Sequence, residues 1–391
     1  MHCLIATSFY TSLIAACVAS KNGSISWAPA LRERAKALES DLESHSVEDF
    51  RRAVDAQGRA LLGAMLDGIQ AWRGSPRQPR PAEPPSIWRE GTTRLLDYAP
   101  QGGRPVLVIP SLINQAYILD LTEEGSLLRF LAAQGLRPLL VDWGAPGPIE
   151  RGFDIAAYLL RLRKALLRAN AIAAGRPVPV LGYCMGGTLA VGLAAQAGTG
   201  VASLALMAAP WDFHADRPEQ ARAVAAFASL HAPLWTALGE VPVDMLQGCF
   251  AALDPFLGLR KFARFATMDP ASRSARAFVA LEDWLNDGVP MAAPAALEAM
   301  TGWYGANRPA LLDWRLGGQV VDPARIDAPA LALIPAADRI VPPESALALA
   351  RALPRVEVIR PGSGHIGMVV ARGMREAVWQ PLAEFLGRYP G

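Results

Sequence analysis

The 391-residue sequence has little cysteine, little histidine and little net charge, and each shortage excludes a class of site. Its four cysteines are Cys3, Cys17, Cys184 and Cys249; they form no C-x-x-C pair and accompany no histidine cluster. This pattern excludes a zinc motif and a disulfide framework, and it favours a reducing, cytoplasmic environment. The net charge is only +2, which implies no polyanionic partner such as nucleic acid. We expect neither a metal nor a cofactor.

The sequence also offers no convincing membrane span. Residues 1–20 are apolar but are diluted by threonine and serine, and no lysine or arginine precedes the apolar stretch. The segment is too short and too polar to cross a bilayer. Cys17 ends a stretch that resembles a lipoprotein cleavage box, yet we favour an upstream extension over an export signal. Whether roughly the first 30 residues belong to the mature protein stays open.

Beyond the N-terminus, the pattern of apolar residues divides the chain into three parts. Apolar stripes predict helices between residues 30 and 73, and a proline-rich linker follows, so residues 1–86 form an N-terminal helical extension. We expect it to pack on the core; docking to a partner subunit or a granule surface is the alternative. Residues 87–211 and 317–391 alternate strands and helices, whereas 212–316 is helical and rich in alanine and aromatics. This predicts a mostly parallel, doubly wound α/β sheet with an inserted cap at 212–316.

The individual elements of the sheet domain are also predicted. We expect strands at 94–98, 106–109, 138–142, 178–181, 201–207, 330–334 and 356–360, and helices at 125–134, 155–171, 188–196, 344–353 and 372–388. Asp212 and His214 follow the strand at 201–207; we interpret them as residues at the hinge of the cap, and the alternative is that they line the pocket.

The most informative motif is Gly182-Tyr-Cys-Met-Gly186, between an apolar strand and a helical stretch. It is the G-x-S-x-G nucleophile elbow of α/β-hydrolases with cysteine in place of serine. Glycine is needed at both ends because the turn is strained and the helix starts close behind it. The N-terminus of that helix favours a thiolate and a developing oxyanion. Cys184 is therefore the predicted nucleophile.

A cysteine nucleophile needs a base, and the base needs a group that orients it. Of the five histidines only His365 follows a late strand and precedes the last helix, in a loop of small residues. Asp338 comes directly after the preceding strand, whereas Asp322 and Asp327 precede that strand. The chain order Cys184, Asp338, His365 matches the nucleophile, acid and base order of this fold.

Two further features concern substrate contacts. The oxyanion hole needs two N–H donors, for which we expect the amides of Met185 and of Leu112, in the loop after the strand at 106–109. Basic residues gather on the helix at 155–171, where they suggest a phosphate contact, although an ordinary solvated face is the favoured interpretation; they are Arg161, Arg163, Lys164 and Arg168.

Several motifs together resemble the signatures of polyhydroxyalkanoate synthases. The resemblance covers roughly residues 90 to 388, and the chain is most similar to the class III type, whose catalytic subunit works with a second, non-catalytic subunit. The motifs are Ile109–Asp120, Val141–Gly144, the elbow with Gly187, Ala209–Phe213, Glu282–Trp284, Gly317–Gln319, Asp338–Pro342 and Gly364–Gly367. This sequence departs from the family at Gln115-Ala116, where lysine or tyrosine is usual, and most widely in the cap.

The resemblance implies an acyltransferase that polymerises (R)-3-hydroxyacyl-CoA and releases CoA. In that reaction Cys184 would hold the acyl chain as a thioester, His365 would activate Cys184, and Asp338 would orient His365 or help to deprotonate the incoming 3-hydroxyl. It also implies a second synthase subunit, a homo-oligomer and contact with the polyester granule surface. A cysteine hydrolase of thioesters, lactones or polyesters on the same residues is the alternative. Acyl chain length stays open.

Overall fold

The computed structural model describes residues 19–20, 24–27, 31–197, 200–371 and 373–389. These residues fall into two compact units: one within Met1–Arg77 and Asp254–Val279, the other within Gln78–Leu253 and Ala280–Gly391. The three-part division made from the sequence stays a prediction, because the units divide the chain elsewhere. Our expectations for residues 1–18, including Cys3 and Cys17, lie outside the described residues.

The larger unit is built on an eight-stranded sheet with the order β1-β2-β4-β3-β5-β6-β11-β12. The first two strands form an antiparallel hairpin that pairs antiparallel with β4, and every other pairing is parallel. The sheet is thus mostly parallel, as the alternating sequence pattern predicted. The strands are β1 (Ser86–Glu90), β2 (Thr93–Asp97), β3 (Arg104–Ile109), β4 (Leu136–Asp142), β5 (Val178–Tyr183), β6 (Val201–Met207), β11 (Ala330–Leu333) and β12 (Val356–Ile359). Strand β1 was not predicted from the sequence.

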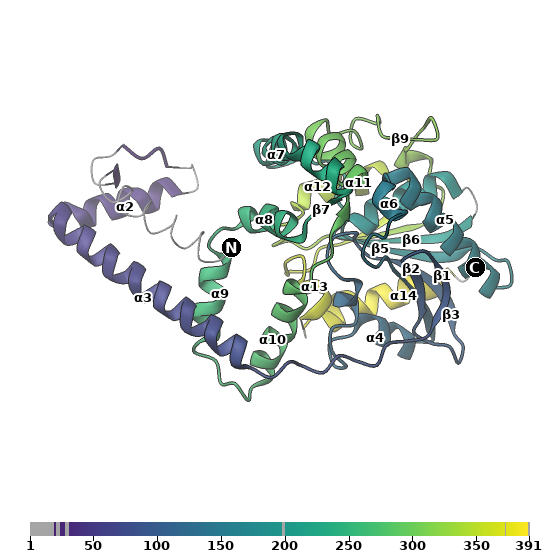
Figure 1. Ribbon diagram of the computed structural model, residues 1–391, viewed down its shortest axis with the longest axis horizontal. Helices are drawn as coiled ribbons and strands as arrows, with labels where there is room; N and C mark the ends of the chain where they lie inside the picture. The colour runs from purple at the N-terminus through teal and green to yellow at the C-terminus, as the bar shows by residue number, and fades with distance from the viewer. Residues whose placement is uncertain (1–18, 21–23, 28–30, 198–199, 372, 390–391) are drawn as a thin grey trace. The chain divides into compact units, whose positions relative to one another are not determined.

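Helices cover both faces of this sheet, and the alternation of side chains along the strands explains why (Figure 1). In β3, Leu107 and Ile109 belong to one buried cluster, and Val106 and Val108 belong to another on the opposite face. The first cluster includes α5 (Ile155–Ile172) and α6 (Met185–Ala197). The second includes α4 (Leu127–Ala133), α13 (Gly367–Val370) and α14 (Gln380–Arg388). Both faces of the central strands are therefore buried.

The strand order places the loops after β3 and β5 next to each other. From β3 the chain passes through α4 to β4 on one side, and then returns through α5 to β5 on the other side of β3. Such a switch point opens a crevice at the carboxyl ends of parallel strands. The loop that begins at Pro110 and the elbow at Cys184 flank this switch point, and the loops after β11 and β12 end at the same edge.

The smaller unit contains α2 (Arg32–Leu42), α3 (Val47–Gly74) and α9 (Leu257–Phe265). Ser46 begins α3, since its hydroxyl accepts a hydrogen bond from Asp49 N at 3.0 Å. Gly68 allows α3 to pack closely on α9, where Met65 meets Phe262 in a small apolar cluster. A helix from the range predicted as cap thus packs on the N-terminal extension.

The remaining elements lie mainly in the range predicted as cap, which is helical apart from very short strands. The helices are α7 (Pro218–Leu238), α8 (Val243–Leu253), α10 (Arg273–Asn286), α11 (Ala293–Leu297), the π-helix η5 (Glu298–Gly305), α12 (Pro343–Ala352) and the π-helix η7 (Arg375–Trp379). The 3-10 turns are η2 (Ala116–Leu119), η3 (Glu150–Gly152) and η6 (Pro323–Arg325). The short strands are β7 (Glu240–Val241) with β8 (Met291–Ala292), and β9 (Arg315–Leu316) with β10 (Gln319–Val320).

One element differs from its prediction at the C-terminal end. In place of a single helix at 372–388, the chain forms a π-helical turn at η7 and then α14. Pro381 stands at the start of α14, where its missing N–H removes a hydrogen bond that a continuous α-helix would need. Within the described part of the chain, no helix combines the length and apolarity needed to cross a membrane.

Candidate active site

Cys184 lies on a strained turn between β5 and α6. Its φ is +55°, in the left-handed region that residues with a side chain seldom adopt. Two hydrogen bonds hold this backbone: Cys184 N donates to Met207 O at 2.9 Å, and Gly187 N donates to Cys184 O at 2.8 Å. The Cys184 side chain is partly exposed, whereas the neighbouring Tyr183 and Met185 are buried. The turn therefore presents the thiol at the carboxyl edge of the sheet.

The glycines of the elbow are needed because the surrounding backbone leaves no room for a side chain. A Cβ on Gly182 would lie 2.5 Å from the Cα of Gly187, at the start of α6. A Cβ on Gly186 would lie 2.5 Å from Pro110 O and still closer to Ile109 O. The second contact shows that the start of α6 packs directly against the end of β3. It brings the loop after β3 beside the elbow.

His365 and Asp338 meet at the same edge of the sheet, in the loops after β12 and β11. Nδ1 of His365 lies 2.7 Å from Oδ2 of Asp338, and both side chains are buried. The other carboxylate oxygen accepts hydrogen bonds from the amides of Ile340 and Val341 at 2.8 and 2.9 Å. Because a carboxylate accepts at Oδ2, Nδ1 carries a proton and Nε2 remains for another partner. The Cys184 side chain also acts on this imidazole, through its charge and through hydrogen bonding.

Opposing effects set the pKa of the His365 imidazole. Burial lowers this pKa because desolvation penalises the charged ring, whereas electrostatic interactions and hydrogen bonds with Cys184 and Asp338 raise it. The raising effects prevail, and the pKa of His365 rises from 6.5 to about 10. The site thus favours the protonated, imidazolium form of His365.

Tyr183 packs against the imidazole, a contact that sequence reasoning missed. The two rings lie 5.2 Å apart at 34°, and the Tyr183 hydroxyl donates to His365 O at 3.3 Å. Burial raises the pKa of Tyr183 well above its ordinary value, so the phenol stays protonated and remains a donor. One feature of the sequence could have indicated this role. Tyr183 directly precedes the nucleophile, and successive residues of a strand point to opposite faces of the sheet, so its side chain is expected on the face opposite to that of Cys184.

The amides near the elbow differ in whether they already have a hydrogen-bond partner. Met185 is the first residue of α6, where helical N–H groups have no partner within the helix. In the loop after β3, the amide of Ile113 donates a hydrogen bond to Oγ of Ser111 at 3.0 Å, so it is not free to bind an oxyanion. The indole of Trp143 donates to Pro110 O at 3.3 Å, which fixes the start of the loop. Met185 and Leu112 stay the predicted donors.

Asp212 and His214 lie where the chain leaves β6. Asp212 Oδ1 accepts from the amides of His214 and Ala215 and from Nδ2 of Asn307, at 2.9, 3.1 and 2.9 Å. A nitrogen of His214 lies 2.8 Å from Tyr304 O. These bonds join the two ends of the segment predicted as cap, and Asn307 was not singled out from the sequence.

The interpretation of the basic helix as a solvated face is wrong for Arg161. This residue is 6% exposed, and its guanidinium lies 3.2 Å from both Glu150 and Glu90. Lys164 also contacts Glu90, at 2.8 Å, whereas Arg163 and Arg168 are exposed. Glu90 of β1 and Glu150 of η3 neutralise the buried guanidinium of Arg161, so this residue has a structural role.

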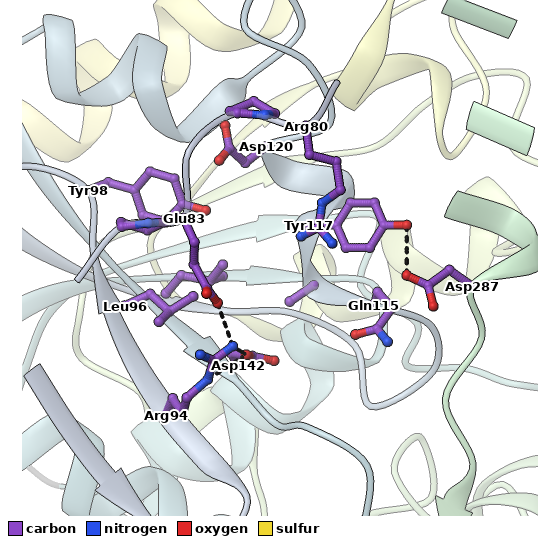
Figure 2. Close-up of a pocket in the computed structure, with 14 residues that line it drawn as sticks. Arg80, Glu83, Arg94, Leu96, Tyr98, Gln115, Tyr117, Asp120, Asp142 and Asp287 are labelled. Carbon is purple, nitrogen blue, oxygen red and sulfur yellow. Dashed lines mark hydrogen bonds and ion pairs between the residues drawn. The ribbon is translucent and has the colours of Figure 1, made fainter. Parts of the chain in front are cut away.

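A polar pocket of about 330 Å³ lies elsewhere in the larger unit (Figure 2). Arg94 bridges Glu83 and Asp142 at 2.6 Å each, and Arg80 lies 3.7 Å from the centre of the Tyr117 ring. The lining residues are Arg80, Pro81, Glu83, Pro84, Arg94, Leu96, Tyr98, Gln115, Ala116, Tyr117, Asp120, Leu140, Asp142 and Asp287. None of the three predicted catalytic residues is among them, so this pocket is distinct from the elbow.

Comparison with known proteins agrees with this geometry. A family model described as the alpha/beta hydrolase fold matches residues 104–371. BpoC of Mycobacterium tuberculosis, a solved structure, is 18% identical with a TM-score of 0.52 over 78% of this chain and 99% of its own, which supports the fold alone.

Curated relatives point to one branch of that fold. The poly(3-hydroxyalkanoate) polymerase subunit PhaC of Haloferax mediterranei is 29% identical over 76% of this chain and 62% of its own length. The PhaC of Haloarcula marismortui is 31% identical over 72% of this chain and 60% of its own length. The chain thus spans about six-tenths of the length of these relatives. The resemblance to polyhydroxyalkanoate synthases drawn from the motifs is confirmed, and the chain belongs to the α/β-hydrolase family.

Proposed function

We propose that the chain is the catalytic subunit of a polyhydroxyalkanoate synthase, which polymerises (R)-3-hydroxyacyl-CoA through a thioester on Cys184. The observation that carries this proposal is the placement of a strained, partly exposed cysteine beside the buried pair of His365 and Asp338. The chain's similarity to polymerase subunits supports the same reading. No cofactor is part of the proposal, since the CoA thioester is itself the activated substrate.

The first half-reaction loads the acyl group onto the enzyme. The proton of Cys184 resides on the imidazole of His365, and the thiolate attacks the carbonyl carbon of the acyl-CoA thioester. The carbonyl π electrons move to oxygen, and the amides of Met185 and Leu112 stabilise that oxyanion. When it collapses, the bond from carbon to the CoA sulfur breaks. The departing CoA thiolate takes the proton from His365, which leaves an acyl thioester on Cys184.

The second half-reaction extends the chain. The 3-hydroxyl of one unit attacks the acyl carbonyl held on the thioester, and a new ester bond forms while the carbon–sulfur bond breaks. His365 takes the hydroxyl proton and returns it to the departing thiolate, so no proton is gained or lost. Both oxygens of Asp338 already accept hydrogen bonds, one from His365 and the other from loop amides. This favours an orienting role for Asp338 over direct deprotonation of the hydroxyl.

A thiol suits this chemistry better than a hydroxyl. Exchange of one thioester for another changes the free energy little, so the acyl group on Cys184 stays ready for transfer. A serine would form an ester of lower energy, from which transfer to a second hydroxyl has less driving force. Water must be kept from the acyl-enzyme for polymer to form, and we assign this role to the cap.

The proposal includes partners. The two relatives are named as polymerase subunits, which supports a second, non-catalytic subunit for this chain. We also propose a homo-oligomer located in the cytoplasm at the surface of polyester granules.

The test follows CoA release and the fate of the acyl group together. The full chain is mixed with (R)-3-hydroxybutyryl-CoA, alongside Cys184→Ala and a matched thiol control, Cys249→Ala. We expect CoA release with insoluble polyester from the wild type and from Cys249→Ala, and neither from Cys184→Ala. CoA release with free 3-hydroxybutyrate would identify a hydrolase on the same residues. Release that survives in Cys184→Ala, or no release even with a class III partner subunit added, would overturn the proposal.

A further inference from the structure

The loop after β3 also contains a residue with a left-handed backbone conformation. Asn114 has a φ of +65°, and asparagine is one of the few residues with a side chain that adopt this region readily. The left-handed turn comes two residues after Leu112, whose amide is the second predicted oxyanion donor. The direction of that amide therefore depends on what holds Asn114 in place.

The side chain of Asn114 is held by α8. Nε2 of Gln247 donates to Oδ1 of Asn114 at 3.0 Å, and it also donates to Leu285 O at 3.1 Å. Gly288 leaves room for the start of α8, since a Cβ there would clash with Cγ1 of Val243. One side chain of α8 thus joins the loop after β3 to the end of α10.

Two further contacts hold the residues that follow Asn114. The indole of Trp284 donates to Gln115 O at 2.8 Å, and this tryptophan is buried. The hydroxyl of Tyr117 donates to Asp287 at 3.0 Å, as Figure 2 shows. The loop beside the elbow is therefore bonded at three nearby positions to residues 247–287, although these lie more than 100 positions away in the sequence.

We propose that Gln247 is a positioning residue, which orients the oxyanion loop through its hydrogen bond to Asn114. The inference rests on the proposed function, because it assigns to α8 the alignment of the Leu112 amide. Ile113 cannot take over that role while its amide is bonded to Ser111. Rotation of the turn at Asn114 would redirect Leu112, and a donor displaced by about 1 Å lowers the rate of the chemical step by up to about 100-fold.

The test compares variants that remove either end of the bond. Gln247→Met keeps an unbranched side chain but loses the donor, and Asn114→Gly keeps the left-handed turn but loses the acceptor. Asn114→Asp retains an acceptor for Gln247 and serves as the conservative rescue. Gln220→Met, on the exposed side of α7, is the matched control for the glutamine substitution.

Two readouts separate loop positioning from general damage. Single-turnover acylation by (R)-3-hydroxybutyryl-CoA should fall about tenfold or more in Gln247→Met and Asn114→Gly, with no further fall in the double variant. Alkylation of Cys184 by iodoacetamide needs no oxyanion hole, so its rate should stay at the wild-type value. Asn114→Asp and Gln220→Met should acylate at close to the wild-type rate. A parallel fall in alkylation would overturn the proposal, as would additive losses in the double variant.

Hydrogen exchange tests the same inference without turnover. Amides in the segment 106–119 should exchange about fivefold faster in Gln247→Met than in the wild type or Gln220→Met. Unchanged exchange would refute the role of Gln247 even in an active enzyme. If the wild type releases no CoA while exchange in Gln247→Met rises, the proposed function fails and the positioning of the loop stands.

Discussion

Replacement of Gly186 by alanine is the sharpest structural test of the elbow. The new Cβ would lie 2.5 Å from Pro110 O and closer to Ile109 O, whereas ordinary contact begins at 3.4 Å. The start of α6 and the end of β3 must therefore separate by about 0.9 Å or more. Both atoms are backbone oxygens at the end of a central strand, so no side chain can rotate away to relieve the clash.

The displacement affects stability and catalysis together. Forcing an extra methyl group into a packed interior costs about 1–3 kcal/mol of unfolding free energy. The same movement shifts Met185 relative to Leu112, and a shift of about 1 Å in a reacting geometry costs up to about 100-fold in rate. We therefore expect a lower urea midpoint and slower acylation of Cys184, while His365 and Asp338 remain in place.

The matched control is Gly387→Ala, because a Cβ at this position in α14 meets nothing within 4 Å. Helical glycine is less favourable than alanine, so this variant should match or slightly exceed wild-type stability. Urea denaturation and single-turnover acylation are measured on both variants. An unchanged midpoint and acylation rate in Gly186→Ala would refute the argument that the elbow touches the loop after β3.

Three further predictions concern stability, each measured by urea denaturation. The pKa of His365 rises from 6.5 to about 10, so its imidazolium stabilises the fold fully below about pH 6.5. That contribution to the free energy of unfolding is lost as pH rises through about 10. We expect no such loss in His365→Gln, and an identical loss in both proteins would contradict the prediction. Arg161→Met should cost about 3–5 kcal/mol because it leaves Glu150 buried and unpaired, and the double replacement with Glu150→Gln should cost less than the sum of the single variants. Gly68→Ala should destabilise the packing of α3 on α9, since its Cβ would lie 2.6 Å from a carbonyl carbon of α9. The control Gly63→Ala, whose Cβ would meet nothing within 4 Å, should stabilise α3. Equal urea midpoints for the two variants would show that the two helices can separate freely.

The sequence alone predicted the sheet and the nucleophile because both are encoded in contiguous residues. Apolar runs of strand length give the strands, and the glycines around Cys184 are demanded by one local turn. His365 and Asp338 followed from chain order, since the loops after successive parallel strands open at the same edge. The boundaries of most elements fell within a few residues of those in the structure. The catalytic roles themselves stay predictions until acylation is measured.

Only the tertiary structure decided which distant residues meet. Arg161 has the sequence spacing of a solvated face, yet Glu90 and Glu150 arrive from other elements and bury it. Residues 254–279 read as part of a cap but group with the N-terminal helices. The bond from Gln247 to Asn114 joins positions 133 residues apart. A sequence pattern records the propensity and periodicity of neighbouring residues, whereas these contacts depend on the path of the folded chain, which no local pattern contains.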